Sequence, residues 1–138
     1  MSNKTIFPHS QIVVKKSKFL GFCFVVSSET EIKAQIADIK AEYNDARHFV
    51  WAYRFQTDGV LKEKYTDDKE PSGSAGSAVL FLLQKKELLN ILVIIVRYFG
   101  WVKLGVGGLA RAYTESAKLS LENFIKKTPP DPRRESGG

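Results

Sequence analysis

Residues 97–113, RYFGWVKLGVGGLARAY, combine glycines and cations in a way that suits anion binding. The sequence changes there from strand-like to helix-like, and a helix start presents unpaired N–H groups at the positive end of the helix dipole. With cations nearby, such a start can bind a phosphate. Alternatively, the glycines only permit a tight turn against a sheet, and spacing alone favours this second interpretation. The residues concerned are Gly100, Gly105, Gly107, Gly108, Arg97, Lys103 and Arg111.

A second Gly- and Ser-rich segment, SGSAG at residues 72–76, precedes another helix-like stretch. Neither segment is a P-loop, because Gly108 is followed by Leu109 and Ala110 instead of Lys and Ser or Thr. GVGG also lacks the glycine spacing of a dinucleotide fingerprint. If the fold brings the two helix starts together, they form one anion site. That predicted site comprises Ser72, Gly73, Ser74, Gly76, Arg97, Lys103, Gly105, Gly107, Gly108 and Arg111.

The strand-like segment 47–55 alternates aromatic residues with small ones. Phe49, Trp51, Tyr53 and Phe55 share one face, whereas the other face includes the small residues of positions 50 and 52. Aromatic side chains on an open sheet face near cations are one way to stack single-stranded bases. The alternative is that the rings lie under helices as core. The predicted nucleic-acid site comprises Lys15, Lys16, Lys18, Trp51, Tyr53 and Arg54.

Residues for catalysis or metal binding are few. The single cysteine, Cys23, excludes an internal disulfide and any cysteine-based zinc site, and there are only two histidines. Asp67, Asp68 and Glu70 are candidates for holding a hard cation, but three acids in a polar loop are usually only solvated. Serines 72 and 74 suit helix caps better than nucleophiles. We therefore expect no catalytic residue, no metal and no cofactor, which favours a binding protein over an enzyme.

Length and composition indicate one globular domain. The 138 residues are 43% hydrophobic and 26% charged, with a net charge of +6 that favours polyanionic partners. The N-terminus does not resemble a signal peptide, and the apolar run 88–96 is too short to span a bilayer. These features predict a soluble, cytoplasmic monomer with no membrane partner.

Hydrophobic periodicity predicts the element order β-α-β-β-α-β-α. We expect strands at residues 11–27, 47–55, 60–66 and 91–96, and helices at residues 28–43, 74–83 and 106–126. Three helices can cover one face of a four-stranded mixed sheet and leave the other face partly open. The expected fold is therefore a two-layer α/β (α+β) sandwich spanning residues 11–127, with a flexible N-terminus at 1–10 and a disordered tail at 128–138.

Four motifs in this order resemble the IMPACT family (YigZ-like proteins). They are SKFLGF at 17–22, DARHFVWAYRF at 45–55, DDKEPSGSAG at 67–76 and RYFGWVKLGVGGLARAY at 97–113, and the resemblance covers about residues 11–125. Three positions depart from the family pattern. Trp101 stands where the family usually has a second glycine, Ser74 replaces threonine, and Phe49 occupies a position that is often polar.

The resemblance implies a two-layer fold with a left-handed crossover, shared with domain IV of elongation factor G and one half of a small-subunit ribosomal protein. Bacterial relatives often carry a ferredoxin-like C-terminal domain, and eukaryotic relatives an N-terminal protein-binding domain. This sequence contains neither pattern, so we expect a bare core domain here. Eukaryotic relatives regulate translation under stress, largely through an N-terminal domain, and bacterial relatives are similar to nucleic-acid- or ribosome-binding modules. We therefore expect a non-enzymatic module that binds RNA, the ribosome or translation factors. The alternatives are a phosphate- or nucleotide-binding protein or enzyme that uses the two Gly-rich helix starts, and a protein-interaction domain.

Overall fold

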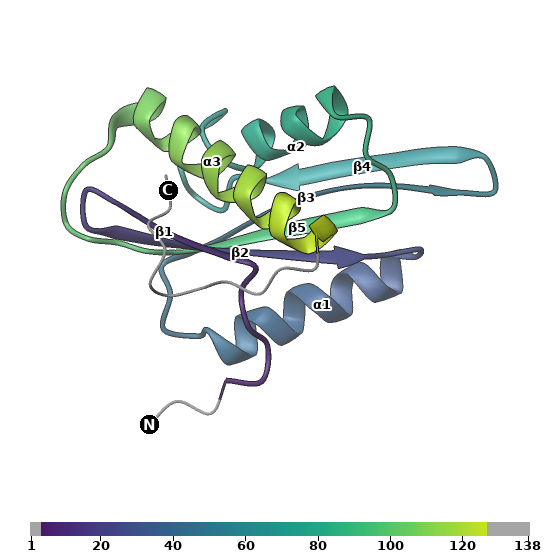
Figure 1. Cartoon of the computed structure of the whole chain (residues 1–138), viewed down its shortest axis with the longest axis horizontal. Coiled ribbons are helices and arrows are strands. Elements are labelled where there is room, and N and C mark those ends of the chain that lie inside the picture. Colours follow the sequence, from purple (N-terminus) through teal and green to yellow (C-terminus); the bar gives the residue numbers. More distant parts are fainter. Residues whose placement is uncertain (1–3, 127–138) are drawn as a thin grey trace.

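The computed structural model describes residues 4–126 as one sheet with helices on both of its faces (Figure 1). None of the helices in this range is long and apolar enough to cross a membrane. The strands are β1 (Ser10–Val14), β2 (Ser17–Val25), β3 (His48–Thr57), β4 (Val60–Thr66) and β5 (Ile91–Tyr98), and the helices are α1 (Glu29–Glu42), α2 (Gly76–Lys85) and α3 (Gly105–Lys126).

The sheet has five strands in the order β1-β2-β5-β3-β4, and every neighbouring pair is antiparallel. The prediction of a four-stranded mixed sheet is therefore wrong. The extra strand arises because residues 11–27, which we expected to form one strand, instead form the hairpin of β1 and β2. Lys15 and Lys16 form this turn with φ angles of 46° and 70°. Two-residue hairpin turns of this kind usually contain Asn or Gly, so a Lys-Lys pair gives no turn signal in the sequence.

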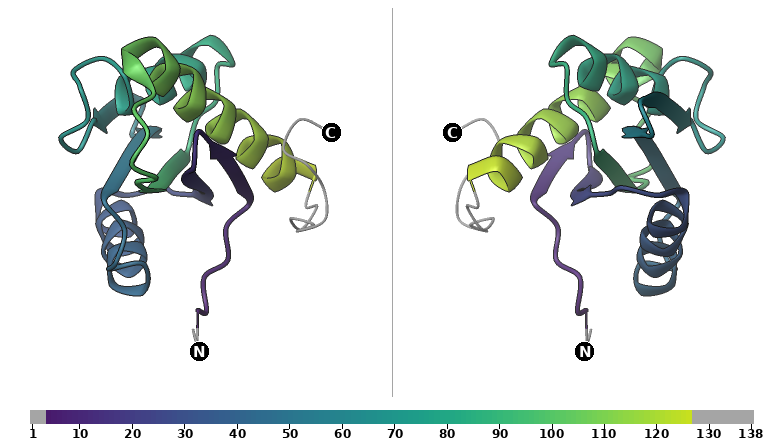
Figure 2. Two further views of the ribbon diagram at one scale, coloured as in Figure 1. Left: turned by 90° about the vertical axis from the view of Figure 1, so that its left-hand side faces the viewer. Right: turned by 90° about the vertical axis from the view of Figure 1, so that its right-hand side faces the viewer.

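The helices lie on both faces of the sheet, not on one as predicted (Figure 2). Helices α2 and α3 cover one face, where Val93 and Ile95 of β5 point, and α1 covers the face of Leu92, Ile94 and Val96. Strand β5 is thus buried on both sides, as its continuous apolar sequence requires. The result is a three-layer arrangement instead of a two-layer sandwich.

The aromatic side of β3 faces α1 and is largely covered. Phe55 is 1% exposed and Tyr53 is 9% exposed, whereas Trp51 and Phe49 are half-buried. The Trp51 ring stacks on Tyr53 with centroids 5.7 Å apart. The small residues of β3, at positions 50 and 52, do face α2 and α3 as expected. The open aromatic face that we predicted is therefore mostly core.

Local signals at element ends are confirmed. Ser28 caps α1 by accepting a hydrogen bond from the Glu31 amide at 3.1 Å. The β3–β4 turn contains Asp58 and Gly59, both with positive φ.

Part of the segment 1–10, which we expected to be flexible, contacts α1. The Glu42 carboxylate accepts hydrogen bonds from the backbone amides of residues 5 and 6, both at 2.9 Å. The tail expected at residues 128–138 lies outside the described residues.

Candidate functional site

The antiparallel register brings four connections to one end of the sheet. The connections meet there because β2 and β3 begin where β5 ends. They are residues 15–16, 43–47, 67–75 and 99–104. We call this region the loop end; it lies at the left of Figure 1, and both α2 and α3 begin there. The four motifs that carry the family resemblance each reach the loop end. The two Gly-rich helix starts are thus on the same side of the molecule, as the predicted anion site requires.

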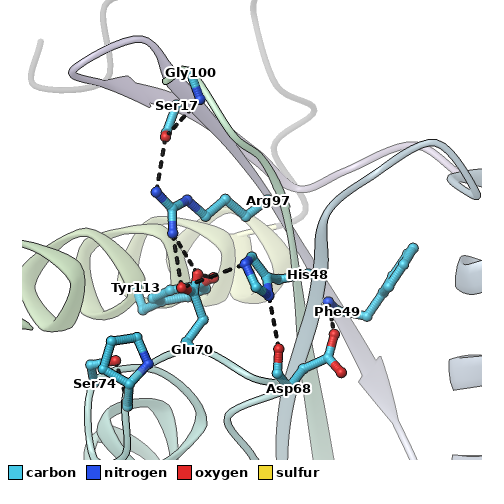
Figure 3. Close-up of polar contacts among 10 residues, drawn as sticks. Ser17, His48, Phe49, Asp68, Glu70, Ser74, Arg97, Gly100 and Tyr113 are labelled. Atoms are coloured by element: carbon cyan, nitrogen blue, oxygen red, sulfur yellow. Dashed lines mark hydrogen bonds and ion pairs between the residues drawn. The ribbon is translucent and has the colours of Figure 1, made fainter. Parts of the chain in front are cut away.

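A buried ion pair lies beneath the loop end (Figure 3). The Arg97 guanidinium donates to both carboxylate oxygens of Glu70, and the side chains of both residues are 4% exposed. Arg97 also donates to Ser17 Oγ at 3.2 Å, and Ser17 Oγ accepts the Gly100 amide at the same distance. The pair therefore ties the 67–75 loop to β5, the β1–β2 turn and the 99–104 loop. Arg97, which we expected to bind an external anion, is already engaged by Glu70.

Tyr113 and His48 complete this buried cluster. The Tyr113 hydroxyl donates to Glu70, and burial followed by the negative charge of Glu70 raises the pKa of Tyr113. His48 places Nε2 3.6 Å from Glu70 Oε1 and Nδ1 2.8 Å from the Asp68 carbonyl oxygen. Since the phenol stays protonated, it serves as a hydrogen-bond donor and not as a base. The cluster is suited to holding the loops in place, and sequence reasoning did not pair its members.

The N-terminus of α2 already binds a carboxylate of the chain. Asp67 accepts hydrogen bonds from the Gly73 amide at 3.1 Å and the Ser77 amide at 3.3 Å. The next residue, Asp68, accepts the Phe49 amide at 2.7 Å. These acids were candidates for holding a cation, but each has an internal partner, and no group of three or more His, Cys, Asp or Glu residues within 4–126 could hold a metal ion.

The α2 part of the predicted anion site is also closely packed. Ser74 is fully buried and donates to the Pro71 carbonyl oxygen. A Cβ on Gly76 would lie 2.1 Å from the Thr66 carbonyl oxygen, so Gly76 lets α2 approach β4 closely. The segment containing Ser72, Gly73, Ser74 and Gly76 thus supports packing and offers few free N–H groups to an external anion.

The α3 part of the predicted anion site is more open. The first turn of α3, which contains Gly105, Gly107 and Gly108, has no acidic residue. Lys103 and Arg111 are exposed beside it, and Arg111 Nη1 lies 3.4 Å from the position that a Cβ on Gly107 would occupy. A hollow of about 640 Å³ between this helix and the β1–β2 turn is lined by residues that include Lys15, Leu104, Gly108 and Arg111.

The predicted nucleic-acid residues do not form one surface. Lys15 and Lys16 are exposed at the loop end, and Lys18 lies beside it with Nζ 4.8 Å from the Tyr98 ring centroid. Arg54 instead pairs with Glu63 of β4 at 2.8 Å and donates to the Leu88 carbonyl oxygen, in the connection after α2, at 3.1 Å. Tyr53 is buried under α1 with Trp51 stacked on it, as described above.

Two loop-end residues were missed by the sequence analysis, Arg47 and Trp101. The signal for Trp101 was present, because a large aromatic stands where the family usually has glycine. Both residues are exposed, and the guanidinium carbon of Arg47 lies 5.8 Å from the Trp101 ring centroid. Among residues 4–126, six exposed loop-end cations make no ion pair within 4 Å: Lys15, Lys16, Arg47, Lys69, Lys103 and Arg111.

These features define a small antiparallel α/β domain with a basic loop end fixed by a buried ion-pair cluster. The chain belongs to the IMPACT family, since the family profile of the Impact N-terminal domain matches residues 15–121. It is 39% identical over 114 residues to IMPACT family member YvyE of Bacillus subtilis, covering 83% of this chain and 52% of that protein. Identity to IMPACT family member YigZ of Escherichia coli is 33% over 119 residues, covering 84% and 58% of the two chains.

Two solved structures have similar folds. A crystal structure of a hypothetical protein superposes with a TM-score of 0.72 at 31% identity, covering 84% of this chain and 59% of that one. The two-domain translational regulator Yih1 superposes with a TM-score of 0.55 at 26% identity, covering 79% and 45%. The chain therefore spans between 45% and 59% of the length of these four longer proteins.

Proposed function

We propose that this domain is a non-enzymatic module that binds RNA or the ribosome and contributes to regulation of translation. The observation that carries the proposal is the charge arrangement at the loop end. Six exposed cations there have no ion-pair partner within residues 4–126, whereas the acids of the same region are engaged internally. Such a surface attracts phosphates, and each phosphate that it neutralises releases counterions from the nucleic acid.

The internal engagement of the acids is specific. Asp45 accepts from the Tyr98 hydroxyl at 2.8 Å, Asp67 accepts from amides at the start of α2, and Glu70 pairs with Arg97. The buried cluster holds its polar groups together beneath the surface. These contacts favour a rigid binding surface over a reactive centre.

The family relationship supports a ligand in the translation machinery. One structural relative is described as a two-domain translational regulator, and this chain matches 45% of it. The sequence resemblance also implies a fold shared with an elongation-factor domain and a ribosomal protein. A role in translation is common to these relationships.

Binding of fluorescently labelled single-stranded RNA, measured by anisotropy across a salt series, tests the proposal. We expect weak binding, micromolar or poorer, that falls steeply with salt. Replacing Lys15 and Lys16 with Gln should reduce the slope of log affinity against log salt by about 0.7 for each phosphate that is no longer neutralised. The matched control replaces Lys85 and Lys86 with Gln, since these exposed lysines lie at the opposite end of the sheet. RNA binding that is undetectable at low salt, or equal effects of the two pairs, would contradict the proposal.

A second candidate function is binding of a small phosphate compound at the start of α3. It is favoured by the adjoining hollow, whose lining includes two cations, Lys15 and Arg111, against one acid, Glu115. The lack of an acidic residue in the first turn of the helix also favours it. In this case inorganic phosphate should shift the amide NMR signals of Val106 and Gly107 saturably, and Arg111→Gln should abolish the shift. Unchanged signals at millimolar phosphate would exclude this candidate.

A further inference from the structure

Trp101 has an unusual environment for a large aromatic residue. The residue is 78% exposed, and its φ angle of 63° lies in the left-handed region that disfavours residues with a Cβ. The exposed ring therefore gains little from burial, and the backbone conformation would suit glycine better. Packing within this domain does not account for a tryptophan at this position, whereas a ligand on the free ring face would.

The ring borders a hollow with both aromatic and charged walls. The hollow measures about 350 Å³, near the lower end of the range of about 300–1,000 Å³ that is usual for small-ligand sites. The centroids of the Phe99 and Trp101 rings lie 4.9 Å apart with an interplanar angle of 59°. The lining residues are Asp45, Ala46, Arg47, Tyr98, Phe99 and Trp101.

One exposed cation, Arg47, lies over both rings of this pair. The guanidinium carbon of Arg47 is 5.7 Å from the Phe99 centroid and 5.8 Å from the Trp101 centroid, within cation–π range. Lys18 lies over the Tyr98 ring that forms another wall. The backbone of Lys16 packs directly against Gly100, where an added Cβ would meet it at 2.1 Å. Asp45, the acid of the lining, is engaged by the Tyr98 hydroxyl at 2.8 Å. A flat aromatic ligand carrying negative charge matches the rings and the cations that remain.

We propose that Trp101, Phe99 and Arg47 form a stacking site for one unpaired base of single-stranded RNA. The base stacks on the exposed face of Trp101, and Arg47 together with the neighbouring lysines binds the adjoining phosphates. This site rests on the proposed function, because it assigns the base-contacting residues of the same RNA-binding surface. It replaces the β3 aromatic face, which α1 covers, as the place where a base would be stacked.

The first test uses the protein's own fluorescence. The chain has two tryptophans, so Trp51→Phe leaves Trp101 as the single indole reporter. Adenosine monophosphate, titrated to millimolar concentration, should quench Trp101 saturably because the base stacks on the indole. Ribose 5-phosphate, which has the phosphate but no base, should not. An amide NMR spectrum like that of the wild type would show that the Trp51→Phe protein is folded.

The second test measures RNA binding and melting temperature on the same variants. Trp101→Gly should weaken binding of single-stranded RNA about tenfold, and the melting temperature should stay the same or rise because glycine accepts the positive φ. Trp101→Phe should retain most of the binding. Phe81→Ala, which removes an exposed aromatic from α2, should change neither quantity.

The outcomes separate this site from the proposed function. If wild-type protein binds RNA and Trp101→Gly binds it equally well, the stacking site is refuted while RNA binding stands. If wild-type protein does not bind RNA but adenosine monophosphate quenches Trp101, RNA binding and the assignment of the base to RNA are both refuted, and the site binds a free nucleotide instead. If adenosine monophosphate leaves Trp101 unquenched, the stacking site is refuted, and the exposed ring is better explained as a contact for a protein partner.

Discussion

Arg97 and Glu70 form a buried pair in which one guanidinium nitrogen donates to both carboxylate oxygens, at 2.9 and 2.7 Å. The two residues are 27 positions apart and come from β5 and from the loop that precedes α2. Ser17, Tyr113 and His48 surround the pair. The shape of the loop end therefore depends on one electrostatic contact in the interior.

Breaking this pair should destabilise the fold strongly. Glu70→Ala leaves the Arg97 charge buried without its partner, which typically costs about 3–5 kcal/mol. The double variant Glu70→Ala/Arg97→Met leaves no buried charge, so its loss of stability should be smaller than the sum of the two single losses. Urea unfolding of the four proteins gives the comparison. Losses that simply add would show that the two side chains do not interact energetically.

Replacing two glycines of the motif at 97–113 with alanine should change the stability of the protein in opposite directions. A Cβ on Gly100 would lie 2.1 Å from the Lys16 carbonyl, so Gly100→Ala forces the backbones apart and should cost about 1–3 kcal/mol. Gly107 lies in the first turn of α3 with room for a Cβ, so Gly107→Ala should stabilise the protein by about 0.5–1 kcal/mol. Thermal melting of both variants checks this pair. Equal destabilisation would mean that Gly107 has a conformational role that its helical position does not explain.

Trp51 should contribute to stability. Its ring stacks on Tyr53 beneath α1. Trp51→Ala should therefore lower the free energy of unfolding by about 3 kcal/mol. This is the lower end of the range for truncating a core aromatic, because Trp51 is only half-buried. Phe81→Ala is the control, since that ring is exposed on α2. A Trp51→Ala protein that melts like the wild type but binds RNA tenfold more weakly would instead support the β3 face as the stacking platform.

The Cys23 thiol should be unreactive in the native protein. Burial raises its pKa to about 12 from 9.0, an effect partly opposed by the hydrogen bond to Ser120. Because the folded-state pKa is the higher one, this contribution to stability is present below pH 9 and is lost as the pH rises toward 12.

At pH 8, a disulfide reagent such as 5,5′-dithiobis(2-nitrobenzoic acid) should therefore react with Cys23 only when the protein unfolds. The rate should rise with urea well below the unfolding midpoint. Since Cys23 is the single cysteine, the absorbance signal belongs to this residue alone. Immediate stoichiometric reaction in native buffer would show that the region between β2 and α3 opens readily.

Sequence periodicity was sufficient to predict most of the helices and strands. The capping signal at Ser28, the Asp58-Gly59 turn and the amphipathic pattern that ends at Lys126 each depend on neighbouring residues, so the local sequence specifies them. The continuous apolar sequence of β5 also indicated a central strand. The Lys15–Lys16 turn was missed because its positive φ angles are adopted by residues that carry no turn preference.

Tertiary structure alone decided which face each helix covers and which polar residues meet. A helical stripe shows that α1 is buried on one side, but not whether it packs with α2 and α3 or against the opposite face of the sheet. The apolar residues on both sides of β2 were the available sign of a second covered face. Likewise, the sequence named Arg97 as a cation near a Gly-rich helix start. Only the strand register brought Glu70 to it, because the pairing of buried charges depends on contacts between segments distant in the chain.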